Sequence, residues 1–374
     1  MKEGWEVKKL GEVCEILDSQ RKPVTKKDRR AGCYPYYGAT GIQDYVDSYI
    51  FDGRYLCVGE DGAKWGTNDK TAFVIEGKCW VNNHAHILKL HDCIIDTFAE
   101  YYLVFKDLNE YITGAIVQKL TQQALRQIPI TLPPLPEQEK IVAELDCLSG
   151  IIEKKKQQLK ELDALAQSIF YEMFGDPVEN EKGWEVKSIG DVSVSINYGT
   201  SSPSNYEGKY KYLRMNNLTY DGYLDLSNTK SIDLLEEDLE KYIVRRGDIL
   251  FNRTNSKELV GKTALFNLDE EMVIAGYIIR VRVDANVTLP IYVVRYLNTP
   301  FMKSYFSGMC KGAVNQANIN SKELKAIPLP CPPLSLQHSF ASKVEAIEKQ
   351  KELIKQSIAE TELLFNSRMQ YYFG

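Results

Sequence analysis

Two stretches of ten residues are nearly identical in this chain: GWEVKKLGEV begins at Gly4 and GWEVKSIGDV begins at Gly183. Two further pairs follow them in the same order. LRQIPITLPPLPEQ (125–138) recurs as LKAIPLPCPPLSLQ (324–337), and TGAIVQ (113–118) recurs as KGAVNQ (311–316). A period near 180 residues indicates a duplicated domain, because solenoid repeats have periods of roughly 20–50 residues. The chain is therefore predicted to hold two copies of one module, the second longer by about twenty residues.

Each copy is predicted to have a β-rich first part and a helical second part. Short apolar, β-branched runs alternate with Gly, Asn and Asp, and one helical stretch follows them. The expected strands are 54–59, 71–75, 242–251 and 272–283, and the expected helical stretches are 96–108 and 289–307. The prolines Pro133, Pro134 and Pro136, matched by Pro332 and Pro333, favour a helix that starts just after them.

The second part of each copy carries a heptad repeat. Alternate steps of four and three residues from Ile141 to Met173 meet an apolar side chain at nine of ten positions, and the second copy keeps this register. The expected seam residues are Ile141, Leu145, Leu148, Ile152, Leu159 and Leu162, and then Phe340, Val344, Ile347, Ile354, Ile358 and Phe365. Either each helix packs on its own domain, or the two helices pack on each other as one long rod; we favour the rod. A helix from Glu137 to Phe174 would be roughly 57 Å long.

The composition is that of a soluble globular protein. Of 374 residues, 44% are hydrophobic and 26% are charged, and no apolar run is long enough for a membrane helix or a signal peptide. We therefore expect the chain in the cytoplasm, with its eight cysteines as free thiols. The net charge of −5 does not indicate a nucleic-acid partner, so phosphate contacts must come from local basic clusters.

Sequence motifs for catalysis are missing. SKELVGKT (256–263) ends like a phosphate-binding loop, but Ser256 stands where the first glycine is needed. The chain has no G-x-G-x-x-G cofactor loop and no Asn-Pro-Pro-Tyr/Phe box of the amino-methyltransferases. HAH at 84–86 fits strand histidines or a DNA contact better than a metal site. The chain is therefore predicted to have no catalytic site and no metal site.

The whole chain resembles the specificity subunit of type I restriction-modification systems. The resemblance rests on the duplicated GWEVKKLGEV start, on IPITLPPLPEQEKIVAELD (128–146), and on GDILFNRTNS with GKTALF within 247–266. Its most specific part is Pro-Pro-Leu-x-x-Gln followed by a heptad repeat, which occurs twice. Leu336 stands where the first copy has Glu137, so the second helix start is less typical.

The resemblance implies an α+β fold. Two mixed α/β target recognition domains would be separated by two long helices that pair as an antiparallel coiled coil, in a pseudo-twofold internal repeat. The expected ranges are 1–132 for the first recognition domain, 133–179 for the first spacer helix region, 180–330 for the second recognition domain and 331–374 for the second spacer helix region.

The resemblance also implies partners. Each recognition domain would read one half of a bipartite, asymmetric target in double-stranded DNA, while the helices set the spacer and dock two methyltransferase subunits. Restriction subunits would join through the methyltransferase complex, and no membrane is involved. The chain itself would bind no cofactor, because S-adenosylmethionine, ATP and Mg²⁺ would bind to the partner subunits.

The first copy has three candidate DNA-contacting stretches. One is the amide-rich VQKLTQQ (117–123) just before the helix entry, where the amides can instead cap structure. RKPVTKKDRR (21–30) carries six basic residues and one acidic residue, which fits a phosphate clamp or a plain solvated loop. VGEDGAKWGTNDK (58–70) is the stretch that corresponds to the polar loop of the second copy. The expected contacts are Arg21, Lys22, Lys26, Lys27, Arg29, Arg30, Lys64, Asn68 and Lys70.

The second copy has four candidate stretches, one of which is NYGTSSPSNY (197–206) with its interleaved Tyr and Asn residues. FNRTNSK (251–257) offers Asn for adenine and Arg for guanine, although an ordinary polar hairpin also fits. KYKYLRMNN (209–217) interleaves basic, aromatic and amide side chains, and AVNQANINS (313–321) is rich in amides. The expected contacts are Lys209, Lys211, Arg214, Asn216, Asn217, Asn252, Arg253, Thr254, Asn255, Ser256, Lys257, Asn315 and Gln316.

Two other classes of protein stay open at this point. One is a single-chain DNA methyltransferase or nuclease with an unrecognised active site, which the missing cofactor loop disfavours. The other is an adaptor whose duplicated modules bind proteins, which the near-neutral charge of each module allows. A steep dependence of DNA affinity on salt would separate a DNA reader from an adaptor.

Overall fold

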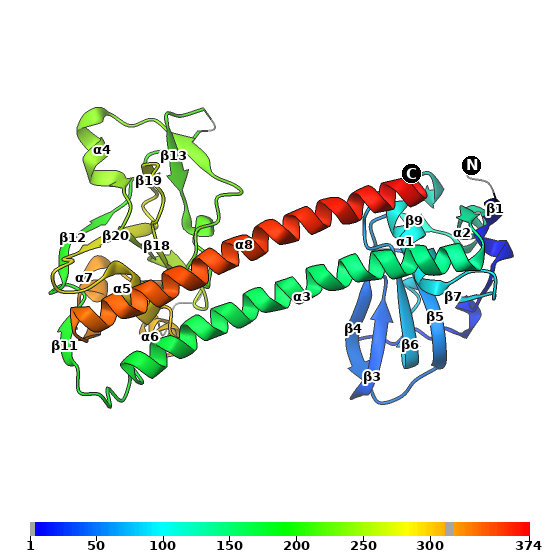
Figure 1. Ribbon diagram of the computed structural model, residues 1–374, viewed down its shortest axis with the longest axis horizontal. Coiled ribbons are helices and arrows are strands. Elements are labelled where there is room, and N and C mark those ends of the chain that lie inside the picture. The colour runs from blue at the N-terminus through cyan, green and yellow to red at the C-terminus, as the bar shows by residue number, and fades with distance from the viewer. Residues whose placement is uncertain (1–3, 206, 311–316) are drawn as a thin grey trace. The chain divides into compact units, whose positions relative to one another are not determined.

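The computed structural model describes residues 4–205, 207–310 and 317–374 (Figure 1). The chain divides into a first unit, Met1–Gln157 with Lys355–Gly374, and a second unit, Gln158–Ile354. Each contains a β-rich globular part and about half of each of two 40-residue helices, α3 (Leu135–Phe174) and α8 (Leu334–Phe373). The division thus falls inside the helices and not at the helix starts, because each helix half packs into the core of its own unit.

The globular part of the first unit is built on a six-stranded sheet in the order β2-β7-β5-β6-β3-β4. Its strands are β2 (Cys14–Ile16), β3 (Ala31–Gly38), β4 (Gly41–Val46), β5 (Phe51–Gly59), β6 (Ala72–Val81) and β7 (Ala85–Leu90). All neighbours are antiparallel except β3 and β6. Helix α1 (Asp96–Phe105) packs on β5 and β6 through the fully buried Phe98 and Leu103. A short hairpin, β8 (Ile112–Thr113) and β9 (Lys119–Leu120), and helix α2 (Gln122–Gln127) follow.

The globular part of the second unit has two four-stranded sheets, in the orders β12-β20-β16-β18 and β14-β13-β19-β15. The strands are β12 (Ser193–Tyr198), β13 (Tyr210–Leu213), β14 (Lys230–Ile232), β15 (Ile243–Val244), β16 (Ile249–Asn252), β18 (Thr263–Leu265), β19 (Met272–Ile274) and β20 (Ile278–Val283), and β17 (Thr254–Asn255) pairs with β21 (Ala317–Asn318). The helices are α4 (Glu236–Tyr242), α5 (Pro290–Leu297), α6 (Pro300–Met309) and α7 (Ser321–Lys325). In the first of these sheets, β12, β20, β16 and β18 take the places that β2, β7, β5 and β6 take in the first unit. Both units therefore share one arrangement of strands, which we call their common frame.

Two apolar runs predicted as single strands are divided. Residues 242–251 become β15 and β16 around a turn in which Gly247 has a φ of 95°, and residues 272–283 become β19 and β20. In both cases the two pieces belong to different sheets, so the chain crosses from one sheet to the other. The predicted helix 289–307 is also divided, because Pro300 begins a new helix whose N-cap is Thr299.

The two motifs that repeat most clearly pair with each other in each unit. β1 (Glu6–Lys9), from the Gly-Trp stretch, runs antiparallel to β10 (Pro129–Leu132), from the Ile-Pro stretch. β11 (Glu185–Ser188) and β22 (Pro328–Cys331) form the same two-stranded ribbon. The predicted duplication is therefore present in the fold, and one ribbon closes each module.

A buried glutamine fixes the start of each long helix. Gln138 Nε2 donates to the Pro133 carbonyl at 2.9 Å, and its Oε1 accepts from the Ile95 N–H at 2.9 Å. Gln337 repeats this arrangement, because its Oε1 accepts from the Leu289 N–H at 2.8 Å. Ile95 and Leu289 directly precede α1 and α5, so each glutamine satisfies an N–H at one helix start while it anchors the first turn of another helix.

Within each unit the halves of α3 and α8 lie side by side in opposite directions (Figure 1). In the first unit Arg368 donates to Glu144 at 2.9 Å, and in the second unit Lys351 pairs with Asp163 at 2.6 Å. Of the seam residues, Ile141, Leu145, Ile152, Leu162, Phe340, Val344, Ile347, Ile354 and Ile358 are buried and Leu148, Leu159 and Phe365 are half-buried.

The ends of the long helices belong to the apolar cores. In the second unit the ring centroid of Phe174 lies 5.1 Å from that of Phe340 and 4.8 Å from that of Tyr292. In the first unit Phe373 packs on Phe98 with a centroid separation of 5.5 Å. Over the described ranges, none of the helices combines the length and the apolar character needed to cross a bilayer.

Candidate nucleic-acid interface

In both units the residue that directly follows strand β5 or β16 makes the same two backbone hydrogen bonds. We call this residue and its surroundings the corner of the globular part. In the first unit the Glu60 N–H donates to the carbonyl that precedes β7, and the Glu60 carbonyl accepts from the Leu120 N–H, both at 2.8 Å. In the second unit Arg253 makes the same two bonds, to the carbonyl that precedes β20 and to the Ile319 N–H, both at 2.9 Å. Glu60 and Arg253 therefore occupy equivalent positions and carry opposite charges.

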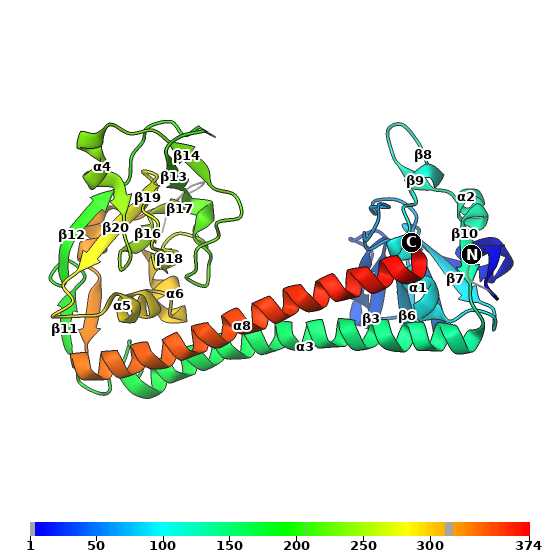
Figure 2. The same ribbon diagram turned by 45° about the horizontal axis from the view of Figure 1, so that its top comes forward.

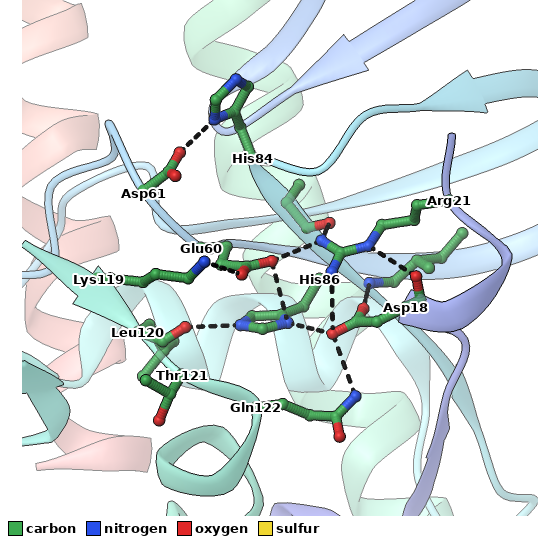
Figure 3. A network of polar contacts seen from close by, with 12 residues as sticks. Asp18, Arg21, Glu60, Asp61, His84, His86, Lys119, Leu120, Thr121 and Gln122 are labelled. Atoms are coloured by element: carbon green, nitrogen blue, oxygen red, sulfur yellow. Dashed lines mark hydrogen bonds and ion pairs between the residues drawn. The ribbon is translucent and has the colours of Figure 1, made fainter. Parts of the chain in front are cut away.

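A buried ionic network fills this corner in the first unit (Figure 3). His86 Nδ1 lies 2.5 Å from an Asp18 oxygen, and His86 Nε2 lies 2.7 Å from the Leu120 carbonyl oxygen. Both ring nitrogens of His86 therefore contact oxygen atoms that can accept a hydrogen bond. Arg21 pairs with Glu60 at 2.6 Å and with Asp18 at 3.3 Å. The side chain of His86 is 1% exposed and that of Arg21 is 10% exposed, so the network lies inside the domain.

The cations of the network keep both carboxyl groups ionised. Burial by itself raises the pKa of Asp18, but the hydrogen bond and charge of His86, together with Arg21, bring that pKa below its usual value. Burial also opposes ionisation of Glu60, and the hydrogen bonds from Lys119 and Arg21 lower its pKa. The Lys119 ammonium lies 2.6 Å from Glu60 Oε1. The corner is thus an almost balanced cluster of charges.

Asp18, Glu60 and His86 also have the residue types of a metal site. Their ligand atoms lie within 4.8 Å of one another, and they form the one group of this kind in the part of the chain that the structure describes. A metal ion would need a free lone pair on His86, but both ring nitrogens contact oxygen acceptors. Arg21 and Lys119 already supply the positive charge that the carboxylates need. The arrangement therefore fits an ionic network better than a metal centre.

The corner of the second unit holds a stacked arginine. The guanidinium carbon of Arg253 lies 4.9 Å from the centroid of the Tyr198 ring. Its NH1 is 3.5 Å from the Gly276 carbonyl oxygen, and its buried Nε has no hydrogen-bond partner among the described residues. Tyr277, which follows Gly276, is 51% exposed. An arginine held by stacking on an aromatic ring is suited to a bidentate contact with guanine.

The sequence model of the family described as type I restriction modification DNA specificity domain matches this chain twice, over residues 2–164 and 181–363. The chain belongs to this family. It is 28% identical over 384 residues to a Haemophilus influenzae protein assigned as a type I restriction enzyme specificity subunit, with 99% of this chain and 95% of that protein covered. The EcoKI specificity subunit of Escherichia coli K12 is 22% identical over 70% of this chain and 59% of that protein. The S subunit of a type I restriction-modification system from M. genitalium has the same fold, with a TM-score of 0.60, 14% identity, and 98% of this chain and 95% of that chain covered.

In the first specificity domain, part of the predicted basic loop has a structural role. Arg21 is committed to the ionic network, so we remove it from the predicted phosphate contacts. Arg29 is half-buried and pairs with Asp44 at 3.3 Å. The predicted contacts that stay exposed in this domain are Lys22, Lys26, Lys27, Arg30, Lys64, Asn68 and Lys70.

In the second specificity domain, three predicted contacts are buried. Asn252 is 0% exposed and Asn217 is 1% exposed. The Asn217 amide donates to the carbonyls of Asp225 and Asn228, at 2.8 and 3.0 Å, and the buried Thr254 hydroxyl donates to the Asn318 side chain. These buried side chains hold the loops together and cannot reach a base edge. We therefore remove Asn252, Asn217 and Thr254 from the predicted DNA contacts.

The other predicted contacts of the second specificity domain include two whose side chains have polar partners within the chain. Lys211 pairs with Glu270 at 2.7 Å, and Arg214 donates to the Asn228 carbonyl at 2.9 Å. All of the remaining ones that the structure describes are exposed or half-buried: Lys209, Lys211, Arg214, Asn216, Arg253, Asn255, Ser256 and Lys257. Asn315 and Gln316 lie outside the described residues.

Sequence reasoning missed the ionic network, and it singled out the stretch 197–206 without naming Tyr198 as a contact. The members of the network come from four separate segments of the chain, at residues 18–21, 60, 86 and 119–120, and together form no local motif. An alignment of the two specificity domains on β5 and β16 places Glu60 opposite Arg253, and that reversal of charge was the available signal.

Proposed function

We propose that this chain is the DNA-recognition subunit of a type I restriction-modification complex and has no active site of its own. In this proposal each unit reads one half of a bipartite, asymmetric target in double-stranded DNA. The observation that carries the proposal is that two globular parts share a strand order and a terminal ribbon, yet present Glu60 and Arg253 at equivalent positions. One frame with two different corners suits two different half-sites.

Arg253 is the proposed base reader of the second unit. Its stack on Tyr198 limits the rotamers of a long side chain, so less entropy is lost when the guanidinium meets guanine. Lys257 is exposed in the same loop and suits a neighbouring phosphate. In the first unit, the exposed Lys22, Lys26 and Lys27 suit the same positioning role.

The chemistry belongs to partner subunits in this proposal. Two methyltransferase subunits, which would bind S-adenosylmethionine, dock on α3 and α8, and restriction subunits that use ATP and Mg²⁺ join through them. Large apolar side chains exposed on the long helices support such docking, among them Leu353 at 65%, Leu363 at 71% and Leu364 at 50%. The helices also set the number of base pairs between the half-sites.

A methylation map of the host genome tests the proposal. Cells that contain the chain and its methyltransferase subunit should methylate one bipartite sequence, and cells without the chain should not. Arg253→Lys should relax the sequence at one position in one half, because an ammonium group cannot make the bidentate contact. Arg246→Lys, at an exposed arginine paired with Asp269, should leave the map unchanged. A map that persists without the chain would refute the proposal.

A further inference from the structure

A β-hairpin projects from the globular part of the first unit (Figure 2). In β8 and β9, Ile112 lies opposite Leu120, and residues 114–118 form the tip. At the tip, Ile116 is 98% exposed and Val117 is 64% exposed. Two successive large apolar side chains that stay in water gain nothing from folding, so their display on an ordered hairpin indicates a surface for a partner.

The base of this hairpin is held firmly. His86 Nε2 donates to the Leu120 carbonyl at 2.7 Å, and the Leu120 N–H donates to the Glu60 carbonyl at 2.8 Å. The Lys119 ammonium pairs with Glu60 at 2.6 Å, and the Leu120 side chain is fully buried. The hairpin therefore leaves the domain from a rigid support, and the ionic network is that support.

The shape of the tip depends on a glycine. Gly114 has a φ of 98°, and a Cβ at this position would lie 2.1 Å from the Val117 carbonyl oxygen. No other residue fits there without a shift of the backbone. The sequence thus specifies one conformation that presents Ile116 and Val117 outward.

The charge of the segment favours DNA as the occupant. Residues 111–127 contain no acidic residue, two basic residues (Lys119, which pairs with Glu60, and Arg126) and four glutamines. Of these glutamines, Gln122 donates to Asp18 and Gln127 accepts from Lys9. A stretch without acids can approach phosphates, and glutamine pairs with adenine. Apolar side chains contact thymine methyl groups or wedge between base steps.

We propose that the β8–β9 hairpin enters a DNA groove as part of the reader of the first unit. Ile116 and Val117 contact bases, and the network of Asp18, Glu60 and His86 positions them. This inference rests on the proposed function and names a surface that the proposed function alone does not specify.

The test uses the complex of this chain with its methyltransferase subunit. A duplex with the target from the methylation map and an unrelated duplex are titrated over a range of salt concentrations. Ile116→Ser combined with Val117→Ser should lower affinity for the target duplex about 10- to 100-fold. Affinity for the unrelated duplex should stay within about twofold, and the slope of log affinity against log salt should not change, because no charge is removed.

Two further variants complete the test. Gly114→Ala keeps both apolar side chains but disturbs the tip, and it should show the same loss. Val7→Ser removes an apolar side chain that is 53% exposed in β1, and it should bind like the parent chain. Thermal unfolding of the double variant should match the parent, because Ile116 and Val117 make little contact with the domain.

The outcomes separate the two proposals. A parent complex that does not prefer its target duplex refutes the proposed function, and the hairpin inference falls with it. A selective parent whose double variant keeps its target affinity within twofold refutes the hairpin inference alone. A double variant that loses the methyltransferase subunit identifies the tip as a protein-docking surface and also overturns the inference.

Discussion

At position 60 the first unit carries a glutamate, and at the equivalent position 253 the second unit carries an arginine. The side chains around these two positions differ in a corresponding way. Glu60 is neutralised by Arg21 and Lys119, whereas Arg253 is stacked on Tyr198. The same position thus fixes a hairpin in the first unit and holds an arginine stacked on an aromatic ring in the second.

Asp18 should make the free energy of unfolding of the first unit depend on pH in the acidic range. The pKa values of Asp18 and Glu60 are lowered from 3.8 and 4.5, so their pairs contribute stability above those values and lose it as pH falls through the lower, folded values. We expect the free energy of unfolding to fall as pH drops below about 4.5. Asp18→Asn should flatten this fall and cost about 1–3 kcal/mol at neutral pH, because His86 and Arg21 lose a charged partner. Urea unfolding curves over this pH range measure both effects.

Asp92→Asn is the matched control, because Asp92 is an exposed aspartate of the same unit. It should behave like the parent chain at every pH. If Asp18→Asn has the parent's stability and the parent's acid dependence, the ionic network does not stabilise the fold.

At the scale of the helices, each unit has a polar layer inside its apolar seam. Lys155 donates to Thr361 at 3.3 Å in the first unit, and Lys351, only 3% exposed, pairs with Asp163 at 2.6 Å in the second. Tyr223 also accepts from Lys351 at 2.7 Å, so a loop of the globular part joins that layer. The two lysines stand at different layers of the heptad repeat, and such polar layers favour one register over others.

Two neighbouring isoleucines of α3 test the seam. Ile152 is 7% exposed and Ile151 is 37% exposed. Ile152→Asp buries an unpaired charge and should lower the free energy of unfolding by about 3–5 kcal/mol. Ile151→Asp should cost less than about 1 kcal/mol, because its carboxylate stays hydrated. Urea unfolding of both variants measures the difference, and equal costs would mean that the seam has been placed on the wrong face.

At the scale of the whole chain, the features that could be predicted from the sequence were those that depend on long stretches of residues. The duplication and the two long helices depend on many residues at once, and the first of these helices, predicted from 137, is found from 135. The fate of single polar side chains was harder to predict. Asn252, Asn217 and Arg21 have the residue types of DNA contacts, but polarity alone could not show that the two asparagines are buried or that Arg21 pairs with Glu60. The pairing of β1 with β10 and of β11 with β22 could not be predicted either, because no local sequence pattern indicates which distant strands pair.

Exchange of one globular part tests the account most directly. Residues 189–327, between β11 and β22, are replaced with the same segment of another member of the family, so that the ribbon and both long helices are kept. The methylation map of the host genome should then change in one half of the target, while the other half and the number of bases between the halves stay the same. A map that changes in both halves, or in neither, would contradict the claim that each unit reads its own half-site.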